Sequence, residues 1–134
     1  MKKLEFIFRV ANTEKDGAGH FSRCLSIIQN LKGKNCLLVL DRNTDFFLKR
    51  LQNYNIDIYD FNSSVKKEVK CKICILDGYN FNKEEKDYWR KSSECLVVID
   101  DIYRKHDYAD LIVNLGMQNN IKKINNVTLI SGLE

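Results

Sequence analysis

The chain of 134 residues contains no proline, so proline places no turn in it. It lacks any apolar run near the roughly 18 residues that a membrane-spanning helix needs. Its first residues carry charges but no long apolar segment of a signal peptide. The chain also lacks a large excess of charge of one sign, because its net charge is only +4. No basic face with interleaved aromatic residues stands out. We therefore expect a cytoplasmic protein with no membrane span and no nucleic-acid partner.

A disulfide framework is also missing. The five cysteines are odd in number and have no framework spacing, which predicts reduced and mostly buried thiols. Cys71 and Cys74 have Cys-x-x-Cys spacing, but they lie in an apolar, strand-like run, and no second pair or histidine group completes a metal site. We expect core cysteines there, no metal and no cofactor.

Apolar runs alternate with amphipathic segments along the whole chain. This pattern predicts a single α/β domain, residues 1–134, with a mostly parallel sheet. Gly33 should end the first helix, and Phe47, Leu48 and Leu51 should face inward from the second. The polar segment 116–126 is expected to be a loop. Strands are expected at residues 4–10, 36–40, 56–59, 71–76, 96–99, 111–114 and 127–130, and helices at 19–32, 45–54 and 82–92.

The stretch from Asp16 to Leu25 joins the first strand to the first helix through a glycine turn. Its glycines let backbone N–H groups approach a ligand, and the start of a helix supplies unpaired donors and positive potential. That potential disfavours the charged form of His20, while Arg23, three residues later, shares its helix face. The stretch predicts an anion or sugar-phosphate site with a built-in proton acceptor.

The alternative is that the glycines only turn the chain into its first helix. The stretch is not a dinucleotide-binding fingerprint, because Ser22 stands where the third glycine belongs, and no Gly-Lys-Ser/Thr follows as in a P-loop.

Polar residues also follow the later strands. In an open parallel sheet ligands bind beyond the carboxyl ends of the strands, so these residues should meet the glycine turn at one edge. Taken singly, each aspartate could merely cap a helix or turn, and Tyr79 could be a rim aromatic. A metal-dependent phosphotransfer site is disfavoured, because the twin aspartates come late in the chain. Besides His20 as the catalytic residue, the expected substrate-binding residues are Gly17, Ala18, Gly19, Arg23, Asp77, Tyr79, Asp100 and Asp101.

These segments resemble, in collinear order, a known family: the UDP-2,4-diacetamido-2,4,6-trideoxy-β-L-altropyranose hydrolases of pseudaminic acid biosynthesis and the related spore-coat polysaccharide proteins. The run from Gly17 to Leu25 resembles the family's Gly-x-Gly-His-x-x-Arg-Cys-Leu motif. The other matching segments are Phe8-Arg9-Val10, Leu76-Asp77-Gly78-Tyr79, Val98-Ile99-Asp100-Asp101 and Ala109-Asp110-Leu111-Ile112-Val113-Asn114.

The resemblance implies a Rossmann-like three-layer domain of the GT-B N-terminal type. It implies hydrolysis of a UDP-sugar by water at the anomeric carbon, with His20 activating or orienting that water. Asp77 and Tyr79 would line the sugar side of the cleft. Family members are longer, and their second half binds most of the UDP. This chain thus resembles an N-terminal half, with 115–134 as loop, last strand and start of a linker, and we expect negligible turnover by it alone.

Two other functions stay open. One is the acceptor-binding half of a glycosyltransferase, in which UDP release would require an added acceptor. The other is a non-catalytic α/β binding module, which would be indifferent to replacement of His20. The sugar's stereochemistry is also open, since Ala11 and Asn12 stand where many members carry an aspartate.

Overall fold

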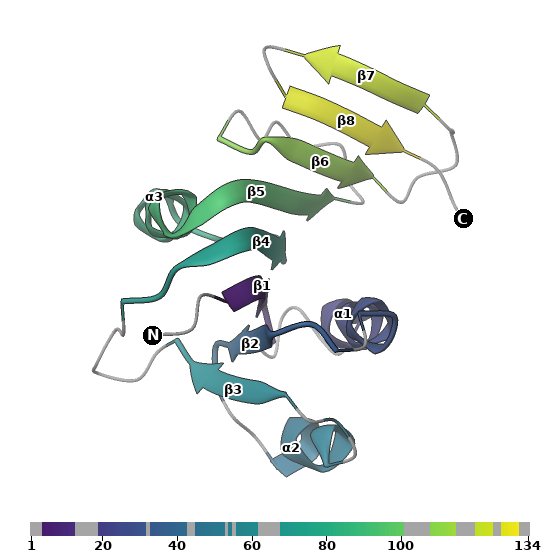
Figure 1. Ribbon diagram of the computed structural model, residues 1–134, viewed down its shortest axis with the longest axis vertical. Coiled ribbons are helices and arrows are strands. Elements are labelled where there is room, and N and C mark those ends of the chain that lie inside the picture. Colours follow the sequence, from purple (N-terminus) through teal and green to yellow (C-terminus); the bar gives the residue numbers. More distant parts are fainter. Residues whose placement is uncertain are drawn as a thin grey trace.

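In the computed structural model of the chain, the described residues are 4–12, 19–31, 33–42, 45–52, 54, 56–61, 68–100, 108–114, 120–124 and 127–131. Strands and helices alternate along most of this length (Figure 1). The strands are β1 (Leu4–Val10), β2 (Cys36–Leu40), β3 (Asp57–Asp60), β4 (Cys71–Asp77), β5 (Ser93–Asp100), β6 (Leu111–Asn114), β7 (Asn120–Ile124) and β8 (Val127–Ser131), and the helices are α1 (Gly19–Gln29), α2 (Asp45–Leu51) and α3 (Lys83–Ser92).

All strands form one sheet in the order β3-β2-β1-β4-β5-β6-β8-β7. Every neighbouring pair is parallel except β7 with β8, which is antiparallel at the edge. The chain runs outward from β1 to β3 and then returns to the other side of β1 with β4. The boundary between β1 and β4 is therefore the point where strand order reverses.

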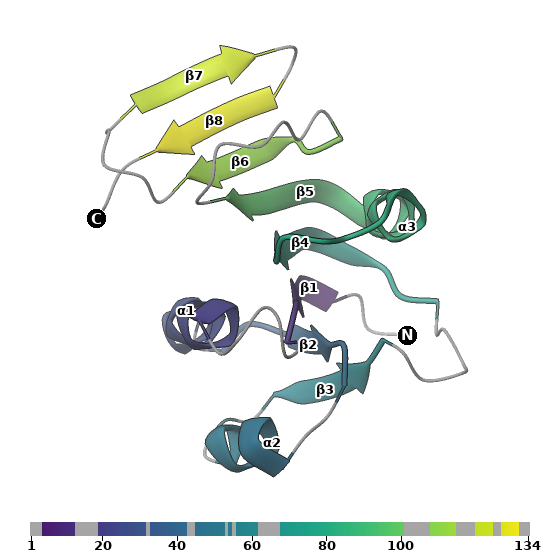
Figure 2. The same cartoon turned by 180° about the vertical axis from the view of Figure 1, so that it is seen from behind.

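The helices lie in two layers, one on each face of the sheet. Helices α1 and α2 cover one face and α3 covers the other, as the front and back views show (Figures 1 and 2). Crossover connections are almost always right-handed, so crossovers that run in opposite directions along the sheet place their helices on opposite faces. The chain is thus an α/β protein with a Rossmann-like three-layer fold, which confirms the predicted fold class.

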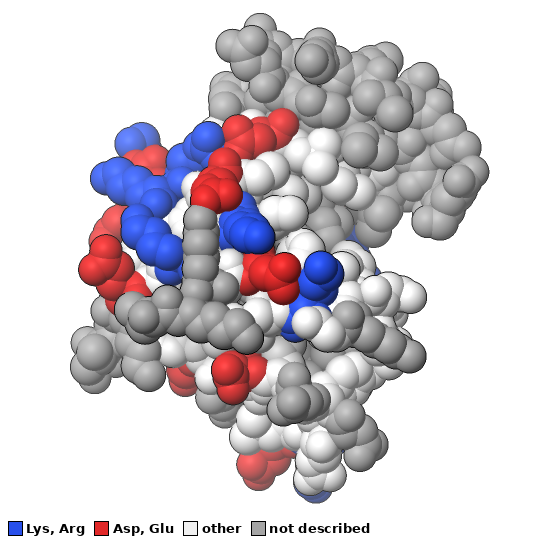
Figure 3. Space-filling view, viewed as in Figure 1, with Lys and Arg blue, Asp and Glu red and all other residues white. Residues whose placement is uncertain are grey.

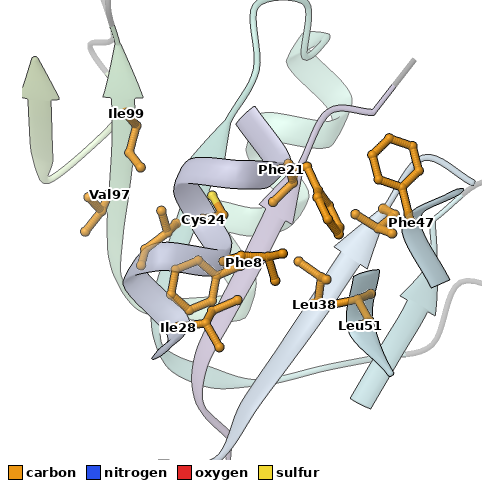
Figure 4. Close-up of a cluster of buried hydrophobic side chains, with 13 residues drawn as sticks. Phe8, Phe21, Cys24, Ile28, Leu38, Phe47, Leu51, Val97 and Ile99 are labelled. Carbon is orange, nitrogen blue, oxygen red and sulfur yellow. The ribbon is translucent and has the colours of Figure 1, made fainter. Parts of the chain in front are cut away.

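Each layer has its own apolar core. On the α1 and α2 face, Phe21 and Ile28 pack against Phe8 of β1, and the rings of Phe21 and Phe47 meet edge to face at 4.6 Å (Figure 4). On the other face, Trp89 of α3 is fully buried. The buried apolar residues of α1 are spaced as on one face of a helix: Phe21, Cys24, Leu25 and Ile28.

Several predicted boundaries differ from the structure at helix ends. Helix α1 ends at Gln29 instead of 32, because the backbone N–H groups of Asn30 and Leu31 bond three residues back and tighten the last turn. Gly33, with φ of 79°, follows this turn, as expected of a glycine that ends a helix. Helix α2 ends at Leu51 instead of 54, where Tyr54 makes a similar turn bond.

Two predictions were wrong in kind. Leu48 is 39% exposed, because Phe47 and Leu51 lie four residues apart on the inner stripe and Leu48 lies beside it. The expected loop at 116–126 contains β7. This strand forms by backbone pairing with β8 at the edge of the sheet, where lysine and asparagine are tolerated and no apolar pattern is needed.

The described surface around α3 carries charge of both signs. Figure 3 shows Lys and Arg side chains interspersed there with Asp and Glu side chains. Lys83 pairs with Asp87 at 3.2 Å along the helix, and Arg90 pairs with Asp110. Interspersed charges cancel over short distances, so this face presents no field of a single sign.

Candidate functional site

The candidate site lies where β1 and β4 end side by side. Val10 is the register partner of Asp77, and the N–H of Ala11 donates to the carbonyl oxygen of Asp77 at 2.9 Å. Helix α1 begins at Gly19, so its N-terminus lies beside the end of β4. This is the switch point of the sheet, where ligands bind in open α/β folds. Gly17 and Ala18 belong to the predicted site but lie outside the described residues.

Asp77 and the first turn of α1 form a buried polar cluster. The side chain of Asp77 is fully buried, and its Oδ1 lies 2.7 Å from Nδ1 of His20, which is 4% exposed. Nε of Arg23 donates to the other carboxylate oxygen, Oδ2, at 2.5 Å, and its Nη2 donates to Oδ1. His20 and Arg23 reach one carboxylate because they are three residues apart on one helix face.

The carboxylate of Asp77 is held in its ionised form. Burial alone would raise its pKa, but hydrogen bonds from Arg23 and His20 outweigh that effect and lower it. The thiol of Cys24, whose Sγ lies 3.4 Å from Oδ2, responds in the opposite direction. Burial first, and then the negative charge of Asp77, raise the pKa of Cys24 well above its ordinary value. The site thus combines an ionised carboxylate with a protonated thiol.

The ring of Tyr79 also contacts His20. Its ring meets that of His20 edge to face, with 4.6 Å between centres and 74° between planes. Such aromatic contacts stabilise a ring in one orientation. The structure therefore brings together His20, Arg23, Asp77 and Tyr79, all predicted from the sequence.

Asp100, the last residue of β5, is not part of this cluster. Val97 and Ile99 belong to the core beneath α1, so strand alternation places Asp100 on the α3 face. There it lies near Tyr108, whose pKa rises to about 12 through burial and the negative charge of Asp100. Asp101 lies outside the described residues. Substrate binding by these aspartates stays a prediction.

A second polar network fixes the backbone that leads into the site. The buried guanidinium of Arg9 donates from Nη2 to Oδ1 of Asp41 at 2.5 Å and from Nε to Glu85 of α3. The N–H of Asn12 donates to Oδ2 of Asp41 at 2.8 Å, and Oδ1 of Asn12 accepts from the N–H of Asp41 at 2.7 Å. The ends of β1 and β2 are therefore tied together. The sequence indicated this network only through Arg9, a charged residue within an apolar strand.

Two features are absent from the part of the chain that the structure describes. Among those residues, no three His, Cys, Asp or Glu side chains gather as a metal site. No helix within the same ranges is long and apolar enough to cross a membrane. Comparison with protein-family models, curated proteins and solved structures finds no match for this chain.

Proposed function

We propose that this chain is the histidine-bearing domain of a nucleotide-sugar hydrolase. The observation that carries the proposal is the place of His20, at the N-terminus of α1 beside the switch point, with Nδ1 against a buried carboxylate. A histidine oriented in this way is suited to accept a proton from water.

The proposed reaction is hydrolysis of a UDP-2,4-diacetamido-trideoxyhexose in surface-polysaccharide or pseudaminic acid biosynthesis. His20 accepts one proton from water while the water oxygen bonds to the anomeric carbon. The bond from that carbon to the β-phosphate oxygen breaks, and UDP leaves with the electron pair. The N-terminus of α1, with the positive end of the helix dipole, is suited to face the pyrophosphate. General-base help of this kind contributes about 10² to 10⁴ in rate.

The resemblance to the hydrolase family supports this choice of substrate and also limits what the chain does alone. In that family most UDP contacts come from a second domain. We therefore expect the UDP-sugar to bind this chain through its sugar, UDP itself to bind weakly, and turnover to be negligible unless a UDP-binding domain is present.

An NMR titration of the ¹⁵N-labelled chain tests the proposal. A UDP-2,4-diacetamido sugar should shift the amide signals of Gly19, His20 and Tyr79, and UDP should shift them much less. His20→Ala should weaken the response to the sugar, while Lys83→Ala on the exposed face of α3 should not change it. A chain that gives no shift with the UDP-sugar, or shifts only on α3, would overturn the proposal. Where UDP is released, release only upon addition of an acceptor would indicate a glycosyltransferase half instead.

A further inference from the structure

The carboxylate of Asp77 has four polar contacts with side chains of the protein. One oxygen lies against His20 and Arg23, and the other against Arg23 and Cys24. The side chain is fully buried. A substrate hydroxyl would therefore have to displace one of these partners to reach it. This arrangement suits a residue that orients its neighbours.

The contact at 2.7 Å between Asp77 and His20 decides which ring nitrogen carries the proton. An ionised carboxylate only accepts hydrogen bonds, so Nδ1 of His20 must donate. In the opposite tautomer Nδ1 would accept from Nη2 of Arg23, 3.0 Å away, but its lone pair would then face the lone pairs of Asp77. The Nδ1–H tautomer is thus favoured, and Nε2 is the basic nitrogen.

Arg23 has a matching role. Its Nε and Nη2 are both directed at Asp77, in the paired geometry that guanidinium and carboxylate groups favour. Its side chain is 22% exposed, whereas that of Asp77 is not exposed at all. The positive charge of Arg23 thus compensates the buried negative charge.

We propose that Asp77 and Arg23 are positioning residues for His20 and not ligands of the substrate. Asp77 holds His20 in the Nδ1–H tautomer, so that the lone pair of Nε2 is the one that accepts the proton of the attacking water. After the transfer, the imidazolium faces the ionised carboxylate, which stabilises it. Arg23 keeps that carboxylate in place. The role of Nε2 rests on the proposed function, whereas the tautomer does not.

Long-range ¹H–¹⁵N spectra of the histidine ring test the tautomer directly. In the neutral ring of His20, the intact chain should show protonated Nδ1 and unprotonated Nε2. The excess should be roughly tenfold or more, as for one hydrogen bond to a charged acceptor. His20→Gln assigns the signals, because the chain has only two histidines. A predominant Nε2–H tautomer in the intact chain would overturn the proposal, whatever the variants do.

Two variants separate positioning from substrate binding. Asp77→Asn should shift the ring toward Nε2–H, while Asp87→Asn, which alters an exposed ion pair, should leave it unchanged. Asp77→Asn should also leave the dissociation constant of the UDP-sugar within about twofold, whereas loss of a ligand hydrogen bond would weaken it about tenfold. With a UDP-binding domain present, the same variant should lower kcat and not raise KM.

The two proposals fail in different ways. An Nδ1–H ring in a chain that binds no UDP-sugar would retain the positioning role and overturn the hydrolase. Binding of the UDP-sugar with an unchanged tautomer in Asp77→Asn would retain the proposed function and overturn the positioning role of Asp77.

Discussion

Ala11 and Gly78 lie so close where β1 and β4 end that a Cβ atom on Gly78 would come within 3.0 Å of the Cβ of Ala11. The ring of Phe81 would be 2.9 Å away on another side. Gly78→Ala should therefore force the two strand ends apart, which typically costs about 1 to 3 kcal/mol of unfolding free energy. Urea unfolding followed by the fluorescence of Trp89, the single tryptophan, measures this.

Gly19→Ala is the matched control for that substitution. A Cβ at Gly19 has nothing within 4 Å, and alanine at the start of α1 should raise stability by about 0.4 to 1 kcal/mol. If Gly78→Ala proved as stable as the unaltered chain, the close packing of the two strand ends would be refuted. We also expect Gly78→Ala to weaken UDP-sugar binding, because Tyr79, which is expected to respond to the UDP-sugar, adjoins the altered residue.

Arg9 should be the most sensitive charged residue of the fold. It is buried, pairs with Asp41 and Glu85, and lies 5.0 Å from the ring centres of both Phe61 and Phe81. Burial alone would lower the pKa of Arg9, but the two carboxylates outweigh it and raise the pKa. Arg9→Met should cost about 3 to 5 kcal/mol, because it leaves two largely buried carboxylates without their cation.

The stability of Arg9→Lys should fall between those of the unaltered chain and Arg9→Met, because lysine keeps the charge but cannot reproduce the planar fork of the guanidinium. Lys83→Met provides the comparison, because Lys83 pairs with Asp87 on the exposed face of α3 and should cost no more than about 0.5 kcal/mol. Equal losses of stability for Arg9→Met and Lys83→Met in urea would contradict the prediction.

The sequence was sufficient for β2 and β6, but it was insufficient for β7 and for the start of β5, which begins at Ser93 instead of residue 96. Residues 36–40 and 111–114 were predicted with the bounds that the structure has, because strands buried on both faces appear as short apolar runs. β7 has no such pattern, and its partner β8 decides its structure. Backbone pairing of this kind leaves no mark on side-chain periodicity.

For the site, the sequence predicted which residues share an edge but not which face each side chain takes. His20 and Asp77 were expected at the edge of the sheet formed by the carboxyl ends of the strands, and they do meet there. Asp100 was expected with them, yet it lies on the α3 face. A slip of one residue turns a side chain to the other face of a sheet, and only the register decides it. The pairing of Arg23 with Asp77 was missed because the sequence did not show that the side chain of Asp77 lies on the α1 face of the sheet.

Acid should reveal the stabilisation that the ionised Asp77 contributes. Because its pKa is lower in the folded chain than the usual value of about 4, the carboxylate stabilises the fold above that value. This contribution is lost as the pH falls below about 4 toward the folded-state pKa. Asp77→Asn should therefore be less stable at pH 7 by about 2 kcal/mol, the scale of hydrogen bonds to a charged group.

The difference between the two proteins in urea unfolding should shrink as the pH falls below about 4. Asp87→Asn should follow the unaltered chain across this range, since Asp87 is half exposed. A difference of constant size from pH 7 to pH 3 would show that Asp77 contributes nothing through its charge.

The five thiols should react in two groups. Cys24, Cys71 and Cys74 are buried, whereas Cys36 and Cys95 are partly exposed. Burial, and after it nearby charges, raise the pKa of both partly exposed thiols, so they should react more slowly than a free thiol at neutral pH. The three buried thiols can react only when the fold opens, so they should react at least about 10³-fold more slowly.

Ellman's reagent should thus modify two thiols in the native chain and five in guanidinium. Replacing Cys36 and Cys95 by serine should remove the fast phase alone, and a third fast thiol in the native chain would contradict the packing of the core.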